Sequence, residues 1–340
     1  MFRRLIPALL TCALTSVALP VCVLAAPGPS GLSVTASIPG PDGGWDYASF
    51  DPAKRRVYVA HGDKVMMIDA DTGKVNADFA QGSRLHAVVP IPGTDLLVTT
   101  NSGDNTARII SAIDGKLLAS IPAAKDTDSA VYDAASGLLI AIGGDSGEIT
   151  LVDPKARKAV GSIVLGGALE FGVVDGKGKL LINVEDKNEI AVVDIASRKL
   201  ITRYRMPGCQ GPTGLALTAD GRLISSCRNG IAKIVDSGTG KEIASLAIGQ
   251  GPDAVFQDAG RARAYIPSGR TGTLAVIALD GPANNTVIDT VTTKPGARTG
   301  TVDLKTGRIY LPSASYAPAD APGQRPGITP GSFAVLVVGR

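Results

Sequence analysis

A pattern that recurs about every 42 residues constrains this chain more than any other feature of its sequence. Each copy is a short hydrophobic run that ends near an aspartate and is followed by a turn rich in Thr, Ser, Gly, Arg or Lys. Four copies are 84, 41 and 42 residues apart and are marked by Asp69, Asp153, Asp194 and Asp236. The skipped copy and the sixth copy carry other residues at the marker position, Ser111 and Ala278. Such a period indicates that one structural unit is repeated along the chain.

The repeated unit consists of strands and not of helices. Its hydrophobic runs are short and rich in Val, Ile and Tyr, and D-G, T-G and G-K turns separate them. The 41 Gly and 22 Pro residues suit a chain with many turns, and a hydrophobic content of 44% is ample for a core. Hydrophobic spacing of the helical period is missing, so the pattern predicts the blades of a β-propeller.

Counting the repeats predicts seven blades. The units begin near residues 44, 83, 126, 167, 211, 251 and 296. The last unit supplies three strands, and a hydrophobic stretch at residues 32–39 precedes the first full unit. We expect this stretch to form the outer strand of blade seven, because closing the ring removes open sheet edges. The expected fold is therefore an all-β seven-bladed propeller, with residues 26–340 as a single domain.

The first 25 residues have the features of a signal peptide. Two arginines precede an apolar stretch at residues 5–24, and small residues at positions 23 and 25 suit a cleavage site. A membrane anchor is the alternative, since about twenty apolar residues can span a bilayer. Pro7 and Pro20 favour a cleaved signal. We expect a periplasmic or secreted mature chain that has no membrane span after cleavage.

Export also bears on the cysteines. Cys209 and Cys227 are the pair that remains in the mature chain. An even number of cysteines in an oxidising compartment favours a disulfide. In the predicted ring, Cys209 precedes blade five and Cys227 ends its second strand at the same face. We therefore expect a Cys209–Cys227 disulfide, with two free buried thiols as the alternative.

Several phrases of the sequence resemble a known family. They include RRVYVAHGDKVMMIDADTGKV, EFGVVDGKGKLLINVEDKNEIAVVD, GCQGPTGLALTADGRLISSC and KPGARTGTVDLKTGRIYLPSASYAP. Over essentially all of the mature chain, the protein resembles the exported YncE-like proteins of the YVTN seven-bladed propeller group. The resemblance implies the fold and little chemistry: most members look like binding or scaffold proteins of unknown ligand, and one is linked to single-stranded DNA. The wider grouping with quinoprotein amine dehydrogenase-like propellers implies architecture, and no quinone is expected.

The repeat also predicts where a functional site would lie. In a propeller, the innermost strand of each blade starts at one face of the central channel, here called the top face. The residues at these starts include four carboxylates, one imidazole and one guanidinium: Asp46, His86, Asp128, Glu170, Asp253 and Arg298. The second strand of each blade ends at the same face and adds His61 and Glu185. We predict that these eight residues form a charged funnel at the top of the channel.

Two interpretations of the funnel remain open. Its carboxylates can accept hydrogen bonds from backbone N–H groups of neighbouring blades, with Arg298 as their counter-charge. Alternatively, they hold a metal ion or a small polar ligand, since concave sites with a few convergent polar groups are the usual binding sites. A metal site would use His61, His86 and Glu170, with Asp46 beside them, because imidazole and carboxylate groups bind transition metals. The variation of these residues between blades favours binding.

Three other features have a structural interpretation. The turn between the first two strands of a blade repeats an aspartate, as in Asp51, Asp133 and Asp175. The basic run at residues 54–56 is expected to be a solvated turn at the bottom face, remote from the funnel. Trp45 could stack on a ligand or wedge between blades.

Three function classes remain, because no hydrolase, nucleotide-binding or zinc motif occurs. The first is a binding protein for a metal ion or a small polar ligand, with an outer-membrane uptake system as its candidate partner. The second is a periplasmic lyase, lactonase or isomerase with His86 as base and Glu170 or Asp128 as acid or cation ligand. The third is an interaction scaffold. A net charge of +3 and few aromatic residues (1 Trp, 7 Tyr, 6 Phe) argue against nucleic acid. We expect a monomer.

Overall fold

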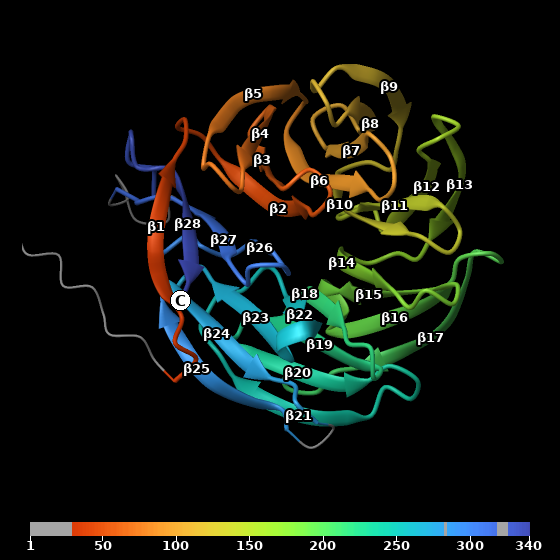
Figure 1. Cartoon of the computed structure of the whole chain (residues 1–340). Coiled ribbons are helices and arrows are strands. Elements are labelled where there is room, and N and C mark those ends of the chain that lie inside the picture. Colours follow the sequence, from red (N-terminus) through yellow and green to blue (C-terminus); the bar gives the residue numbers. More distant parts are fainter. Residues whose placement is uncertain (1–28, 282–283, 318–325) are drawn as a thin grey trace, which may run out of the picture.

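The computed structural model describes residues 29–281, 284–317 and 326–340. In these residues, seven four-stranded antiparallel sheets surround a central axis (Figure 1). The predicted all-β seven-bladed propeller is therefore confirmed. Strands A to D of each blade are ordered from the axis outward.

The first four blades each use four consecutive strands. Blade one has β2 (Trp45–Asp51), β3 (Arg56–His61), β4 (Lys64–Asp69) and β5 (Val75–Gln81). Blade two has β6 (Leu85–Ile91), β7 (Leu96–Asn101), β8 (Thr106–Ser111) and β9 (Leu117–Pro122). Blade three has β10 (Thr127–Asp133), β11 (Leu138–Gly143), β12 (Glu148–Asp153) and β13 (Lys158–Val164). Blade four has β14 (Leu169–Val174), β15 (Lys179–Val184), β16 (Glu189–Asp194) and β17 (Lys199–Arg205), with the short 3₁₀ helix η1 (Glu185–Lys187) after β15.

Blades five and six follow the same order, whereas blade seven combines both ends of the chain. Blade five has β18 (Pro212–Leu217), β19 (Arg222–Cys227), β20 (Ile231–Asp236) and β21 (Glu242–Ala247). Blade six has β22 (Phe256–Asp258), β23 (Arg263–Ser268), β24 (Thr273–Ala278) and β25 (Thr286–Thr292), with η2 (Ala259–Arg261) after β22. Blade seven has β26 (Thr301–Val302), β27 (Ile309–Ser313), β28 (Ala334–Gly339) and, as its outer strand, β1 (Ser33–Pro39).

The N-terminal strand closes the ring. β1 pairs antiparallel with β28, in a register that runs from Ser33 opposite Gly339 to Pro39 opposite Ala334. The two strands lie side by side in Figure 1 although they come from opposite ends of the described chain. The predicted closure of blade seven is confirmed.

Short-range hydrogen bonds of aspartate side chains shape the turn between strands A and B. Oδ1 of Asp51 accepts hydrogen bonds from the backbone N–H groups of Ala53 and Lys54, at 2.9 and 3.1 Å. Asp133 and Asp175 accept equivalent bonds in blades three and four. Such Asx turns reverse the chain between strands A and B. The structural interpretation of these aspartates is therefore correct.

The hydrophobic core lies between the blades. One buried cluster joins Ile140 and Ile149 of blade three to Ile182 and Val193 of blade four, and all four side chains are fully buried. Because alternate residues of a strand face opposite sides of the sheet, each blade presents one hydrophobic face to either neighbour. Packing of blade against blade therefore stabilises the ring, which makes its closure important.

The basic run at residues 54–56 was predicted to be a solvated turn. It instead joins blade one to blades two and seven. Lys54 forms an ion pair with Asp95 of blade two at 2.6 Å. Arg55 forms one with Asp303 of blade seven at 2.7 Å, and the Asp303 side chain is 1% exposed. Arg56 donates a hydrogen bond to the carbonyl oxygen of Ala112 in blade two. The prediction was wrong because the partners are distant in the sequence.

Among the residues that the structure describes, no helix has both the length and the hydrophobicity to cross a membrane. The predicted signal peptide, residues 1–25, lies outside the described residues.

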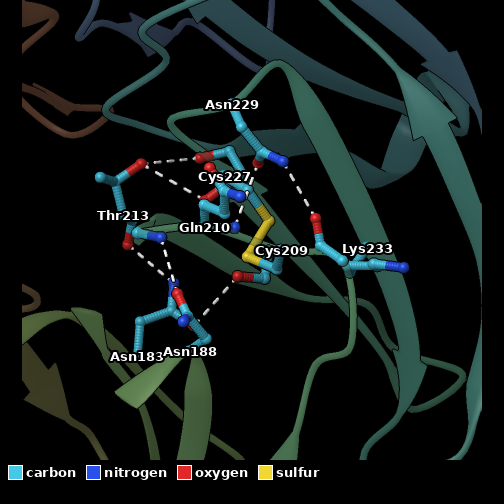
Figure 2. Close-up of a disulfide and its surroundings, with 12 residues drawn as sticks. Asn183, Asn188, Cys209, Gln210, Thr213, Cys227, Asn229 and Lys233 are labelled. Atoms are coloured by element: carbon cyan, nitrogen blue, oxygen red, sulfur yellow. Dashed lines mark hydrogen bonds between the residues drawn. A yellow bond between two sulfur atoms is a disulfide. The ribbon is translucent and has the colours of Figure 1, made fainter. Parts of the chain in front are cut away.

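A disulfide ties the loop before blade five to the end of its second strand. The sulfur atoms of Cys209 and Cys227 are 2.11 Å apart and their Cα atoms 5.5 Å apart. Figure 2 shows the bond between this loop and β19, where Asn229 accepts from the N–H of Gln210 at 3.1 Å and donates to the carbonyl oxygen of Gly208 at 3.0 Å. The predicted Cys209–Cys227 disulfide is confirmed.

Removing this disulfide should lower the free energy of unfolding by about 3 kcal/mol. The bond joins residues 18 positions apart, and a cross-link of that span restricts the unfolded chain by roughly this amount. Urea unfolding of the Cys209→Ala/Cys227→Ala double variant, beside the oxidised wild type, measures the difference. Equal midpoints for the two proteins would contradict the prediction.

Candidate functional site

The charged residues of the funnel occupy one equivalent position in successive blades. Asp46, His86, Asp128 and Glu170 are the second residues of β2, β6, β10 and β14. In each strand the regular pairing with strand B is interrupted after the first residue. A β-bulge of this kind leaves a residue unpaired and re-aims its side chain. The repeated bulge therefore directs these side chains to the mouth of the channel.

His86 lies at the centre of the most compact cluster. Its Nδ1 is 2.6 Å from Oδ2 of Asp46 and 2.8 Å from Oδ1 of Asp128. Its Nε2 is 2.9 Å from Oγ of Ser102, and that hydroxyl donates to the carbonyl oxygen of Arg84 at 3.3 Å. Within the described part of the chain, the potential ligand atoms of Asp46, His86 and Asp128 lie within 4.8 Å of one another, so the three residues could hold one metal ion.

This geometry places a proton or a cation at Nδ1. The Ser102 hydroxyl either donates to Nε2 of His86 or, when it donates to Arg84, accepts the Nε2–H. A neutral imidazole protonated at Nε2 would turn the bare lone pair of Nδ1 toward two carboxylate oxygens. A lone pair and two acceptors repel at hydrogen-bond distance, so Nδ1 carries a proton, in the neutral or the charged ring, or donates its lone pair to a cation. The cluster is therefore arranged around a proton or a metal ion.

The pKa values agree with this description. Burial lowers the pKa of His86, but the hydrogen bonds and charges of Asp128 and Asp46 outweigh burial and raise this pKa to about 10. Burial raises the pKa of Asp46, and the hydrogen bond with His86 opposes that rise. Without a metal, the cluster at neutral pH is an imidazolium held between two carboxyl groups.

Two arginines balance the other acids of the ring. Nε of Arg298 lies 2.9 Å from Oδ2 of Asp253. Arg228 lies 3.4 Å from Oε1 of Glu170 and also forms an ion pair with Glu185. The ring therefore carries more acids than bases, and its two arginines approach from one side.

Crowding leaves two of these acids unusually weak. Burial raises the pKa of Glu170 well above its usual range, and the nearby charge of Asp253 adds to the rise. Burial also raises the pKa of Asp253 to about 6, although Arg298 opposes the change. Carboxyl groups behave in this way when they are desolvated beside other acids. A bound cation would relieve the repulsion.

An apolar plug closes the channel below the charged ring. Tyr47, Ala87 and Ala254 are buried there, with Phe171 and Phe256 packed against them. The rings of Tyr47 and Phe171 have centroids 5.3 Å apart. The plug therefore closes the lower end of the funnel.

A cavity opens beside the ring at the top face. Its volume is about 520 Å³. The charged and aromatic side chains in its lining are Arg228, Asp253, Arg270, Arg298 and Tyr316. The size suits a small molecule, since ligand pockets typically measure about 300–1000 Å³.

The structure corrects the predicted role of His61. This residue is 5% exposed, and its ring packs against that of Phe333 with centroids 4.4 Å apart. Burial lowers its pKa. His61, His86 and Glu170 do not come together as a metal-binding group in the described residues; the group that forms consists of Asp46, His86 and Asp128.

A shift of one residue at the end of strand B explains this error. His61 is the last residue of its strand B, whereas Glu185 follows the last residue of β15 and begins η1. The last residue of the strand still packs against a neighbouring blade, and the residue after it lies in the turn at the top face. Glu185 therefore reaches the ring through Arg228.

Two residues of the ring were missed from the sequence. Ser102 and Arg228 directly follow strand B in blades two and five, at the position of Glu185 in blade four. Aligning the residue after each strand B, in place of its last residue, would have found both.

Trp45 is a wedge between blades. Its side chain is 6% exposed and contacts the rings of Phe333 and Tyr316, with centroids 5.3 and 6.4 Å away. Gly296 has a φ of +90°, and a Cβ there would lie 2.8 Å from Tyr316 and 3.2 Å from Trp45. Only glycine fits this close approach, which positions Tyr316 at the edge of the cavity.

Comparisons with known proteins agree on the fold. No protein-family model matches the chain, and no curated protein matches it. Kuenenia stuttgartiensis hydrazine synthase is 14% identical with a TM-score of 0.68, over 81% of this chain and 92% of that chain. U3-55K is 9% identical with a TM-score of 0.75, over 92% of this chain and 100% of that chain. The RRP9 WD40 repeats are 9% identical with a TM-score of 0.75, over 93% and 99%. At such identities the likeness concerns architecture alone, and the chain is similar to these proteins as a β-propeller.

Proposed function

We propose that the protein is an exported binding protein that holds a divalent transition-metal ion, together with a small polar ligand, in its top-face funnel. One observation carries this proposal: Nδ1 of His86 faces carboxylate oxygens of Asp46 and Asp128 at 2.6 and 2.8 Å. Nδ1 carries a proton at that point in metal-free protein, and a metal ion can take the place of that proton.

The donor set fits a metal such as Zn²⁺. One imidazole nitrogen and two carboxylate oxygens are ligands that Zn²⁺ accepts, and imidazole also suits Cu²⁺ and Ni²⁺. When Nδ1 binds a metal, Ser102 accepts the Nε2–H of His86 and so fixes the orientation of the ring, as partners of metal-binding histidines generally do. Three protein ligands leave at least one coordination position for a bound molecule.

The adjoining cavity supports an anionic group on that molecule. Arg228, Arg270 and Arg298 line it. Guanidinium groups bind carboxylate and phosphate oxygens through paired hydrogen bonds. A ligand with such a group would contact the arginines while another of its oxygens completes the coordination of the metal.

An enzyme of the lyase, lactonase or isomerase type is the alternative for the same funnel. His86 is poorly suited to be its general base, because a pKa of about 10 keeps the imidazole protonated at neutral pH. Glu170 could serve as an acid, since burial raises its pKa. An interaction scaffold has the support of fold likeness alone.

The setting is also a proposal. The resemblance to YncE-like proteins and the apolar N-terminal stretch support a signal peptide over residues 1–25 and export to the periplasm or beyond. The Cys209–Cys227 disulfide suits an oxidising compartment. The mature domain would begin at residue 26, act as a monomer and deliver its ligand to an outer-membrane uptake system.

Calorimetric titration of metal-free protein with Zn²⁺, Cu²⁺, Ni²⁺ or Mn²⁺ tests the function. Binding must displace the Nδ1 proton of His86, so about one proton should be released near pH 7.5. The affinity should also rise about tenfold per pH unit between roughly pH 6 and 9, below the His86 pKa of about 10. Buffers of different ionisation enthalpy measure the proton release. Absence of binding to all four ions near pH 9 would refute the proposal.

A further inference from the structure

A second cavity lies at the bottom face, where the first and last strands close the ring. Its volume is about 1050 Å³, and residues of blades six, seven and one line it. It shares no lining residue with the cavity beside the funnel. Residues of the outer strand β1 and of its partner β28 line it, and these two strands lie side by side in Figure 1.

Four guanidinium groups line this cavity from three separate segments. Arg261 of η2 and Arg263 of β23 are two residues apart, Arg308 lies in the turn before β27, and Arg340 follows β28. The cluster therefore forms where blades six and seven pack together.

The positive charge of the cluster is largely uncompensated. Arg261 forms an ion pair with Asp258 at 2.7 Å. Among the described residues, no carboxylate lies within 4.0 Å of the guanidinium groups of Arg263, Arg308 or Arg340. The carboxylate side chain in the lining, that of Asp71, is already paired with an arginine outside it. Three guanidinium groups thus remain available to an anion.

Two buried tyrosines indicate that the arginines converge. Tyr265 and Tyr310 line the cavity and are each 2% exposed. Burial raises the pKa of Tyr265, and the charges of Arg263, Arg261 and Arg340 all oppose the rise. Arg308 has the same effect on Tyr310. Like charges held around one cavity repel each other, and a bound anion would remove that repulsion.

We propose that this cavity binds a ligand that carries a diphosphate or two neighbouring phosphate groups, held chiefly by Arg263, Arg308 and Arg340. The planar guanidinium group matches phosphate oxygens bidentately, and it stays charged at every physiological pH. Several arginines around one cavity suit an anion of high charge better than a single carboxylate. The volume also exceeds the need of one phosphate and leaves room for the organic part of the ligand.

Titration of the protein with inorganic pyrophosphate at about 150 mM salt tests the proposal. The Arg263→Ser/Arg308→Ser double variant should bind pyrophosphate at least about tenfold more weakly than wild type. It should keep the wild-type melting temperature, because neither arginine has a carboxylate partner in the described residues. The Arg263→Lys/Arg308→Lys variant retains the charge and loses the forked geometry, so it should bind with intermediate affinity. Arg205→Ser, at the exposed end of β17 in blade four, is the matched control and should bind like wild type.

A parallel assay uses phosphatidylcholine vesicles with and without about one tenth diacylglycerol pyrophosphate. Vesicle binding that exceeds pyrophosphate binding and is lost in the serine double variant assigns the phosphate groups to a lipid. Binding of pyrophosphate alone assigns them to a soluble molecule. The proposal is overturned if folded wild type binds neither probe, or if the double variant binds as tightly as wild type. Metal binding at the funnel should be unchanged in all three variants, so the two sites are tested separately.

Discussion

Replacing His86 with alanine is expected to weaken metal binding in the funnel at least about 100-fold, or about 2.7 kcal/mol. The imidazole supplies the nitrogen on which the carboxylates of Asp46 and Asp128 converge. Without the imidazole, two carboxylates remain, and the preference of the site for a transition-metal ion is largely lost. Calorimetric titration of wild type and variant with Zn²⁺ near pH 8 measures the difference.

Two further variants separate binding from architecture. Ser102→Ala removes only the acceptor that orients His86, and we expect about a tenfold loss of metal affinity. Glu170→Gln should weaken the binding of a polar ligand about tenfold, while the melting temperature stays within a few degrees of wild type. If His86→Ala and Glu170→Gln clearly lower the melting temperature and leave affinity unchanged, the ring is architectural.

The His86→Ala variant has a second readout in metal-free protein. The pKa of His86 rises from 6.5 to about 10 on folding, so the folded state binds more protons than the unfolded state between these values. The stabilisation by His86 is therefore complete below about pH 6.5 and is lost as the pH rises toward 10. Wild type should lose on the order of 2 kcal/mol, or several degrees of melting temperature, across this window. His86→Ala should show a flatter profile, and saturating Zn²⁺ should offset the decline in wild type.

Deleting residues 32–39 is expected to lower the melting temperature by about 10 °C or more and to cause aggregation. The deletion removes β1, and with it the buried Leu32 and the partly buried Val34 of the core between blades six and seven. Ile38 is lost from the neighbouring core. Full burial of an aliphatic side chain contributes about 1.5–3 kcal/mol, so one buried and two partly buried side chains together give roughly 3 kcal/mol or more. The deletion also leaves β28 as an open sheet edge.

Calorimetry and light scattering of the purified proteins measure both effects. The matched control is a chain that starts at residue 29 and retains β1, which should melt like the longer protein. Equal stability and equal solubility of the two proteins would show that ring closure by β1 contributes little.

Much of the architecture follows from local sequence pattern. The period near 42 residues, the short β-rich runs and the repeated turn aspartates suffice for seven blades, because blades one to six each form from contacts within about forty residues. The closing strand and the Cys209–Cys227 disulfide follow from the same count. The equivalence of Asp46, His86, Asp128 and Glu170 also follows, since a repeat places the same strand position at the same face.

The direction of a side chain at a strand end does not follow from the count. His61 and Glu185 were aligned together, yet His61 packs on Phe333 and Glu185 reaches the ring. A shift of one residue in the alignment changes which way a side chain points. A repeat located from the sequence alone is accurate to about one residue. The same shift hid Ser102 and Arg228.

Contacts between distant blades lie furthest from sequence pattern. Arg55 of blade one pairs with Asp303 of blade seven, and residues of blades six, seven and one line the bottom cavity. The repeat specifies each blade and the order of the blades around the axis. The closed ring decides which charged side chains meet at the boundary between two blades. Pairing across such a boundary leaves no periodic signal in the chain.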